Sequence, residues 1–161
     1  MSEERLLTFE IGDSLYALPI AGVVEVAEVD EAFAAIPTVP RATGGVINFH
    51  GDALPVLHSQ ALLGVGSAPP RSPVQIVVVT DGPAAQARLG LPVDEILGLV
   101  NGPRPRARGA DPVAERRSID GRVGMILDPA ALVAAARTLI AEGGARQTTG
   151  GEARPETGRE G

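Results

Sequence analysis

The sequence of 161 residues contains no cysteine, no lysine and no tryptophan. Without cysteine, the chain cannot use a thiol nucleophile, a zinc–thiolate site or a disulfide scaffold. Without lysine, it cannot form a Schiff base or a lysine-dependent phosphate loop. Its aromatic side chains are also few, with three phenylalanines and one tyrosine, so stacking platforms for bases or sugars are not expected. The core must therefore be built from aliphatic residues.

The protein is acidic: it has twenty acidic residues and fourteen arginines, which gives a net charge of −6. Nucleic acid is therefore not an expected partner, because phosphate binding needs an excess of cations on one face. The N-terminal residues lack the basic start and apolar run of a signal peptide, and no apolar run approaches the ~20 residues of a membrane helix. We expect a cytoplasmic protein without membrane insertion, built as one domain or two small subdomains.

Short segments with alternating apolar residues predict β-strands in the first third of the chain. Residues 6–11 and 16–20 alternate on either side of a turn at Gly12-Asp13-Ser14. Residues 23–29 alternate again, and this period predicts that Val23 and Glu25 face solvent, opposite Val24 and Val26.

A hairpin is predicted at residues 46–57, with Gly51-Asp52 as a type II′ turn. That register pairs His50 with Ala53. Its apolar face comprises Ile47, Phe49, Leu54 and Val56. Further strands are predicted at 74–80, at 88–100 (one or two) and in a last hairpin at 113–127, and extended connectors or loops at 33–41, 65–73 and 101–112.

One helix is predicted, opening at Asp128-Pro129, because Asp caps free N–H groups and Pro is tolerated in the first turn. Its apolar face comprises Leu132, Val133, Ala136, Leu139 and Ile140. We expect this helix to end at Gly143-Gly144 and residues 142–161 to form a disordered tail, because they contain no apolar residue larger than alanine. The domain would then span residues 5–141. Many short strands with one late helix indicate small barrels or a sandwich.

Four blocks of this sequence, in order, resemble the CheW family. They are FEIGDSLYALPIAGVVEV (9–26), IPTVPRATGGVINFHGDALPVL (36–57), VQIVVVTDGPAAQARLGLPVDEIL (74–97) and IDGRVGMILDPAALV (119–133). The resemblance implies an all-β fold of two intertwined five-stranded SH3-like barrels with a short C-terminal helix. It also implies a non-enzymatic adaptor that uses no metal or cofactor. Its partners would be the regulatory domain of a CheA-type histidine kinase and the cytoplasmic hairpin tip of a chemoreceptor.

The same resemblance places candidate partner-binding residues at Val23 and Glu25, at Asn48 and His50, and at Asp94. Asp94 could equally cap a local turn. The sequence departs from the family at His50, where the family carries arginine, and at His58-Ser59-Gln60, where the family reads Asp-Leu-Arg. Histidine lacks the permanent charge and the bidentate fork of arginine, so partner binding here is expected to differ. An exposed histidine would also make binding sensitive to pH.

Two other function classes share a feature with this sequence. Gly12-Asp13-Ser14-Leu15 spells the signature of GDSL hydrolases, but no Asp-x-x-His motif supplies a base and the residues after Ser14 alternate as a strand. A small-ligand-binding barrel would need an apolar pocket of several hundred cubic ångströms. A metal site is not expected, because the hairpin register makes His50 and His58 diverge.

Overall fold

The computed structural model describes residues 3–29, 33–40, 43–64, 74–82 and 85–153, with side chains as far as residue 142. Within these residues, the strands are β1 Glu3–Ile11, β2 Ser14–Pro19, β3 Val23–Val29, β4 Gly44–Phe49, β5 Asp52–Leu57, β6 Val74–Val79, β7 Leu89–Val93, β8 Glu95–Pro103, β9 Val113–Ile119 and β10 Arg122–Leu127. The helices are a 3₁₀ turn η1 Ile20–Gly22, a short α1 Ser59–Leu63 and a long α2 Pro129–Ala153.

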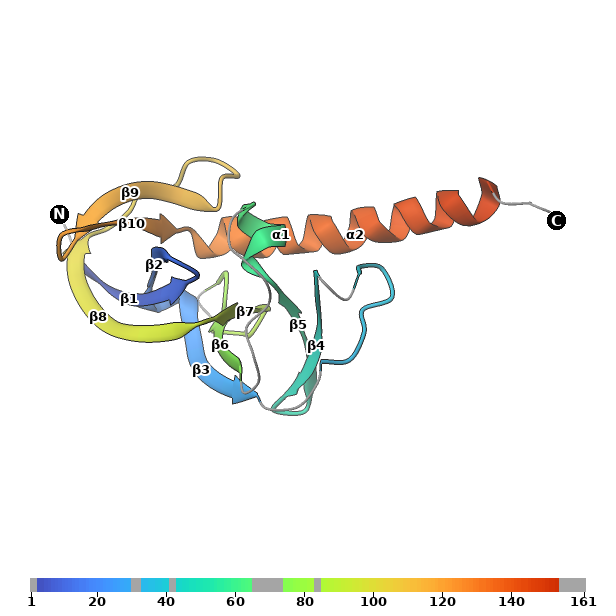
Figure 1. The fold of residues 1–161 in the computed structure, drawn as a ribbon, viewed down its shortest axis with the longest axis horizontal. Coiled ribbons are helices and arrows are strands. Elements are labelled where there is room, and N and C mark those ends of the chain that lie inside the picture. The colour runs from blue at the N-terminus through green and yellow to red at the C-terminus, as the bar shows by residue number, and fades with distance from the viewer. Residues whose placement is uncertain (1–2, 30–32, 41–42, 65–73, 83–84, 154–161) are drawn as a thin grey trace.

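The strands form two five-stranded sheets whose chain segments alternate (Figure 1). One sheet has the order β8-β1-β2-β10-β9 and the other β3-β6-β7-β5-β4. Strands β1 and β2 thus belong to the first sheet, the next five strands form the second sheet, and β8–β10 belong to the first sheet again. This exchange confirms the predicted all-β fold of two intertwined barrels. We name them barrel 1 (β1, β2, β8–β10) and barrel 2 (β3–β7).

Each barrel has its own small core, and a larger core joins them. Barrel 1 is filled by Leu6, Leu15, Ala17, Ile119 and Ile126, and barrel 2 by Ile47, Leu54, Val56, Ile76 and Val78. The joint core takes side chains from both sheets and from α2, among them Phe9, Tyr16, Leu57, Val77, Leu91 and Leu132. Because all of these residues are aliphatic or aromatic, the two barrels and the helix are held together mainly by burial of apolar surface.

The β4–β5 hairpin differs from its prediction by one residue at the turn. Phe49 pairs with Asp52, so His50-Gly51 forms the loop, with φ of 52° and 91°. Positive φ at both positions is the type I′ conformation, not the predicted type II′ turn. Because the loop lies one residue earlier than predicted, each β4 residue pairs with a β5 residue two positions away from its predicted partner. A shift of two keeps every side chain on the same face of the strand. Ile47 and Leu54 are therefore still buried, as predicted.

Strand β3 contains a bulge that changes the predicted faces of Val23 and Val26, while Val24 packs against the core of barrel 2 as predicted. The register with β6 shifts between Val23 and Glu25, so Val24 is an extra residue. Val23 packs against the joint core, instead of facing solvent as predicted. Val26 is 38% exposed, although the alternation placed it on the inward side. Glu25 is exposed, as expected.

Helix α2 begins as predicted but ends later. The Asp128 carboxylate accepts a hydrogen bond from the Ala130 amide at 3.1 Å, which caps the first turn. The predicted end at Gly143-Gly144 is wrong, because the helix continues to Ala153 (Figure 1). Glycine costs a helix only about 1 kcal/mol per residue and keeps its N–H.

The loop predicted at 101–112 begins later, because β8 extends to Pro103. The 88–100 segment forms two strands that meet at Asp94, and the last hairpin turns at Asp120-Gly121 with positive φ at both. Helix α1 was not predicted. The 65–73 loop and residues 154–161 of the predicted tail lie outside the described residues. No helix in the described part of the chain is long and apolar enough to cross a membrane.

Candidate functional site

Two of the predicted partner-binding residues meet across the edges of barrel 2. Glu25 lies on β3 and His50 on the β4–β5 turn, and β3 and β4 are the two edge strands of this sheet. The His50 Nε2 and Glu25 Oε1 atoms are 3.2 Å apart, and both side chains are exposed. The structure therefore brings together two residues that lie 25 positions apart in the sequence. We call Glu25, Val26, Asn48 and His50 the β3–β4 surface.

Asn48 is engaged by the turn that carries His50. Its Oδ1 accepts a hydrogen bond from the Gly51 amide at 2.9 Å. The His50 ring packs edge-on against Phe49, with centroids 4.3 Å apart. These contacts fix the tip of the hairpin, so the exposed imidazole is presented from a defined turn.

Asp94 is placed elsewhere, at the junction of β7 and β8. Its Oδ2 accepts a hydrogen bond from the Gly12 amide at 2.5 Å, and its own amide donates to the Glu10 carbonyl at 2.9 Å. The carboxylate thus holds the β1–β2 turn against the crossing between the barrels. No contact among the described residues joins it to the β3–β4 surface. The contact with Gly12 reaches a turn 82 residues away in the sequence, so it is not the local cap that the sequence left open as an alternative.

A second exposed surface lies on β8, an edge strand of barrel 1. Leu97 and Leu99 are 44% and 49% exposed, while the intervening Gly98 carries a φ of 151°. The sequence did not indicate either leucine, because residues 96–100 (ILGLV) are apolar on both faces and carry no alternation; only the burial in the structure alternates. Because large exposed apolar side chains on one strand often mark contacts between proteins, this face is a candidate interaction surface.

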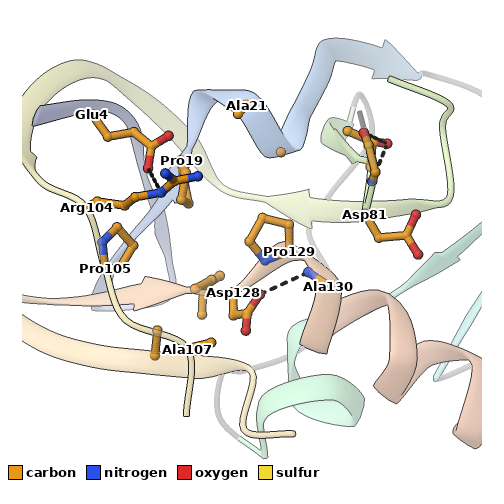
Figure 2. A pocket seen from close by; sticks show the side chains of 15 residues that line it. Glu4, Pro19, Ala21, Asp81, Arg104, Pro105, Ala107, Asp128, Pro129 and Ala130 are labelled. Carbon is orange, nitrogen blue, oxygen red and sulfur yellow. Dashed lines mark hydrogen bonds and ion pairs between the residues drawn. The ribbon is translucent and has the colours of Figure 1, made fainter. Parts of the chain in front are cut away.

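An open groove of about 450 Å³ lies where α2 begins between the barrels (Figure 2). Its lining consists mostly of small residues, such as Pro19, Ala21, Gly22, Pro105 and Ala107, together with four charged ones: Glu4, Asp81, Arg104 and Asp128. Gly22 lets η1 approach closely, because an added β-carbon would overlap the Pro129 ring. Small side chains permit close approach of a partner backbone. A smaller pocket of about 260 Å³ opens beside the core of barrel 1, where Leu15 and Ile119 lie opposite residues 97–100 of β8.

The hydrolase alternative finds little support in this geometry. Ser14 opens strand β2 directly after the Gly12-Asp13 turn, and no helix follows it. His50 contacts Glu25 on barrel 2 and His58 stacks on Phe33, whereas Ser14 lies on barrel 1. The described residues also contain no group of three or more His, Cys, Asp or Glu side chains placed to hold a metal ion.

His58 is a partly buried histidine just before α1. Its ring stacks on Phe33 with centroids 6.2 Å apart, and its Nδ1 is buried without a hydrogen-bond partner among the described residues. Burial lowers the pKa of His58 below its ordinary value. A protonated ring would carry a desolvated charge, so the folded state favours the neutral form.

We expect replacement of His58 by phenylalanine to flatten the acid dependence of stability. As pH falls below about 6.5, the unfolded chain takes up a proton that folded His58 resists, so stability falls by at most about 1.4 kcal/mol per pH unit. Phenylalanine keeps the stacking and removes the titration. Urea unfolding of both proteins between pH 7 and pH 5.5, followed by circular dichroism, measures the difference. Equal slopes for wild type and H58F would contradict this account.

Comparison with known proteins identifies the family. The family model described as "CheW-like domain" matches residues 5–137. Among solved structures, the chain resembles the scaffolding protein TtCheW from Thermoanaerobacter tengcongensis at 22% identity and a TM-score of 0.66, covering 82% of this chain and 88% of that one. No curated protein matches the sequence. Because the family model spans most of the chain and the fold agrees, this protein belongs to the CheW-like domain family.

Proposed function

We propose that this protein is a non-enzymatic adaptor that couples chemoreceptors to a CheA-type histidine kinase in the cytoplasm. The observation that carries the proposal is the Glu25–His50 contact, which joins two positions matched to the family's partner-facing segments. It lies on a protein whose family model covers residues 5–137. The candidate surfaces are exposed faces and an open groove, which suits docking of proteins better than chemistry on a small substrate.

The receptor would bind at the groove and along the adjacent start of β3. The groove is bordered by η1, which leads directly into β3. Its small side chains leave room for a helix, and Val26 adds an exposed apolar contact beside the charged Glu25. This arrangement fits the helix-in-groove mode, in which apolar anchors supply affinity and charged neighbours supply register.

The kinase would bind at the β8 face. Leu97 and Leu99 lie on the outward side of an edge strand, which suits contact with the strands of another small barrel. Signalling contacts of this kind bury on the order of 1,000–1,600 Å² in total. Two separate surfaces would let one adaptor hold both partners at once.

The test is affinity capture from an extract of the source cells, with bound proteins identified by mass spectrometry. Wild type should recover both a chemoreceptor and a CheA-like kinase. Val26→Asp should lose the receptor and keep the kinase, and Leu99→Asp should do the reverse, because each places a charge in one apolar contact.

The matched control is Val123→Asp, which changes a valine that is 69% exposed on β10. It should recover both partners. Recovery of neither partner by wild type, from cells that express both, would contradict the adaptor role. Equal recovery by all three variants would contradict the two surfaces.

A further inference from the structure

The basic residues of this acidic protein gather in one segment. Residues 103–117 contain five of the fourteen arginines and only two carboxylates. The remainder of the chain is therefore more acidic than the net charge of −6 implies. A local concentration of one charge on a protein of the opposite sign attracts partners by complementarity.

Two of these arginines are already neutralised within the fold. Arg117 lies 2.9 Å from Glu115 and is largely buried, and Arg104 lies 3.7 Å from Glu4. Arg106 and Arg108, in contrast, are exposed, and neither forms an ion pair with any described residue. Arg116 is likewise exposed and forms no ion pair with a described residue, but it lies apart in β9. Arg106 and Arg108 lie together in residues 103–108, which we call the arginine loop.

The arginine loop is held in a restricted conformation. Pro103 and Pro105 fix their own φ angles, and Pro105 also restricts Arg104 to extended conformations. The far end is closed by a turn in which the Asp111 amide donates to the Arg108 carbonyl at 3.1 Å. A loop ordered in advance loses little conformational entropy when it binds.

The sequence of the loop alternates arginine with small residues: Arg104-Pro105-Arg106-Ala107-Arg108. In extended backbone, side chains two positions apart lie on the same side. Pro105 and Ala107 line the groove, whereas Arg106 and Arg108 are not among its lining residues (Figure 2). Arg104 lines the groove as well and pairs there with Glu4, so the loop presents two free guanidinium groups, those of Arg106 and Arg108, at the border of the groove. Each guanidinium can hold a carboxylate through two parallel hydrogen bonds.

We propose that the arginine loop is a docking site for an acidic polypeptide segment with carboxylates on alternate residues. The net negative charge of the whole protein disfavours the two other polyanions, a nucleic acid and an anionic membrane, because both extend beyond the loop and would meet its acidic surroundings. A short acidic segment meets only the loop. This inference is independent of the proposed receptor and kinase.

The test uses a fluorescein-labelled peptide of repeated Glu-Ser pairs and the full-length protein, with binding followed by fluorescence anisotropy. The peptide should bind, and its affinity should fall as salt is raised. Arg106→Gln with Arg108→Gln should weaken binding by at least about tenfold, because it removes the guanidinium groups that hold carboxylates. The matched control is Ala134→Glu with Thr138→Glu, which makes the same change in net charge on an exposed side of α2 and should leave affinity within about twofold.

Three outcomes would overturn the proposal. The first is an absence of peptide binding at low salt. The second is equal weakening by both double variants, which would reduce the effect to net charge. The third is equal or tighter binding of an oligothymidine or of phosphatidylglycerol vesicles, which would assign the loop to another polyanion. A thermal melt of each variant confirms that it is folded.

Discussion

Replacing Gly44 by alanine is expected to remove about 3 kcal/mol of stability, at the upper end of what overpacking usually costs. Gly44 pairs with Leu57 in the β4–β5 ladder. A β-carbon at this position would overlap the Val56 carbonyl oxygen and lie 3.0 Å from the Leu57 α-carbon. Both obstacles are backbone atoms of a neighbouring strand, so no side-chain rotation relieves them. A loss of this size is a large share of the stability of an ordinary domain.

Urea unfolding followed by far-ultraviolet circular dichroism measures this loss. The control is Gly82→Ala, because a β-carbon there meets no atom within 4 Å and the residue shows no positive φ. That variant should be nearly neutral or slightly stabilising, since alanine reduces the freedom of the unfolded chain. If G44A unfolded at the same urea concentration as G82A, the close approach of β4 to β5 would be disproved.

Replacing Leu132 by alanine is expected to cost about 2–5 kcal/mol. Leu132 is fully buried on α2 and belongs to the joint core that also contains Phe9 from barrel 1 and Val77 from barrel 2. Its truncation would leave a cavity at the place where the two barrels and the helix meet. The cost should be near the upper end of the range, because three rigid elements cannot all move in to fill the space.

The comparison residue for this second experiment is Leu139, two turns further along α2. It is only partly buried at the edge of the same core, so Leu139→Ala removes the same atoms with a smaller loss of buried surface. The free energies of unfolding should therefore rank wild type first, L139A second and L132A last. An equal loss from both leucines would mean that α2 does not anchor the joint core through Leu132.

The alternation of apolar residues was sufficient to predict most strands, because a half-buried strand repeats every two residues whatever surrounds it. The cap of α2 was equally local: Asp128 bonds the amide of Ala130, two residues away. The end of α2 was not predictable in this way, because glycine weakens a helix without forbidding it. The exchange of chain segments between the barrels was predicted only from the resemblance to the CheW family, because no local pattern encodes it.

The candidate site was predictable only in part. The sequence indicated Glu25 and His50, but their contact depends on the closing of barrel 2 at its two edges. Val23 was assigned to the wrong face, because a bulge shifts the alternation and a bulge leaves little trace in composition. Val26 consequently replaces it as the exposed apolar residue.

By itself, the sequence determined that this protein is built from short strands with an aliphatic core, that thiol and lysine chemistry are excluded, and that its positive charge is concentrated in residues 103–117. These properties follow from residue types and from periods of two or four residues. The tertiary structure alone decided which side chains meet: His50 with Glu25, Asp94 with the turn at Gly12, and Arg104 with Glu4. Such contacts join residues far apart in the chain. Their geometry is fixed only when the two sheets close into barrels and pack against each other.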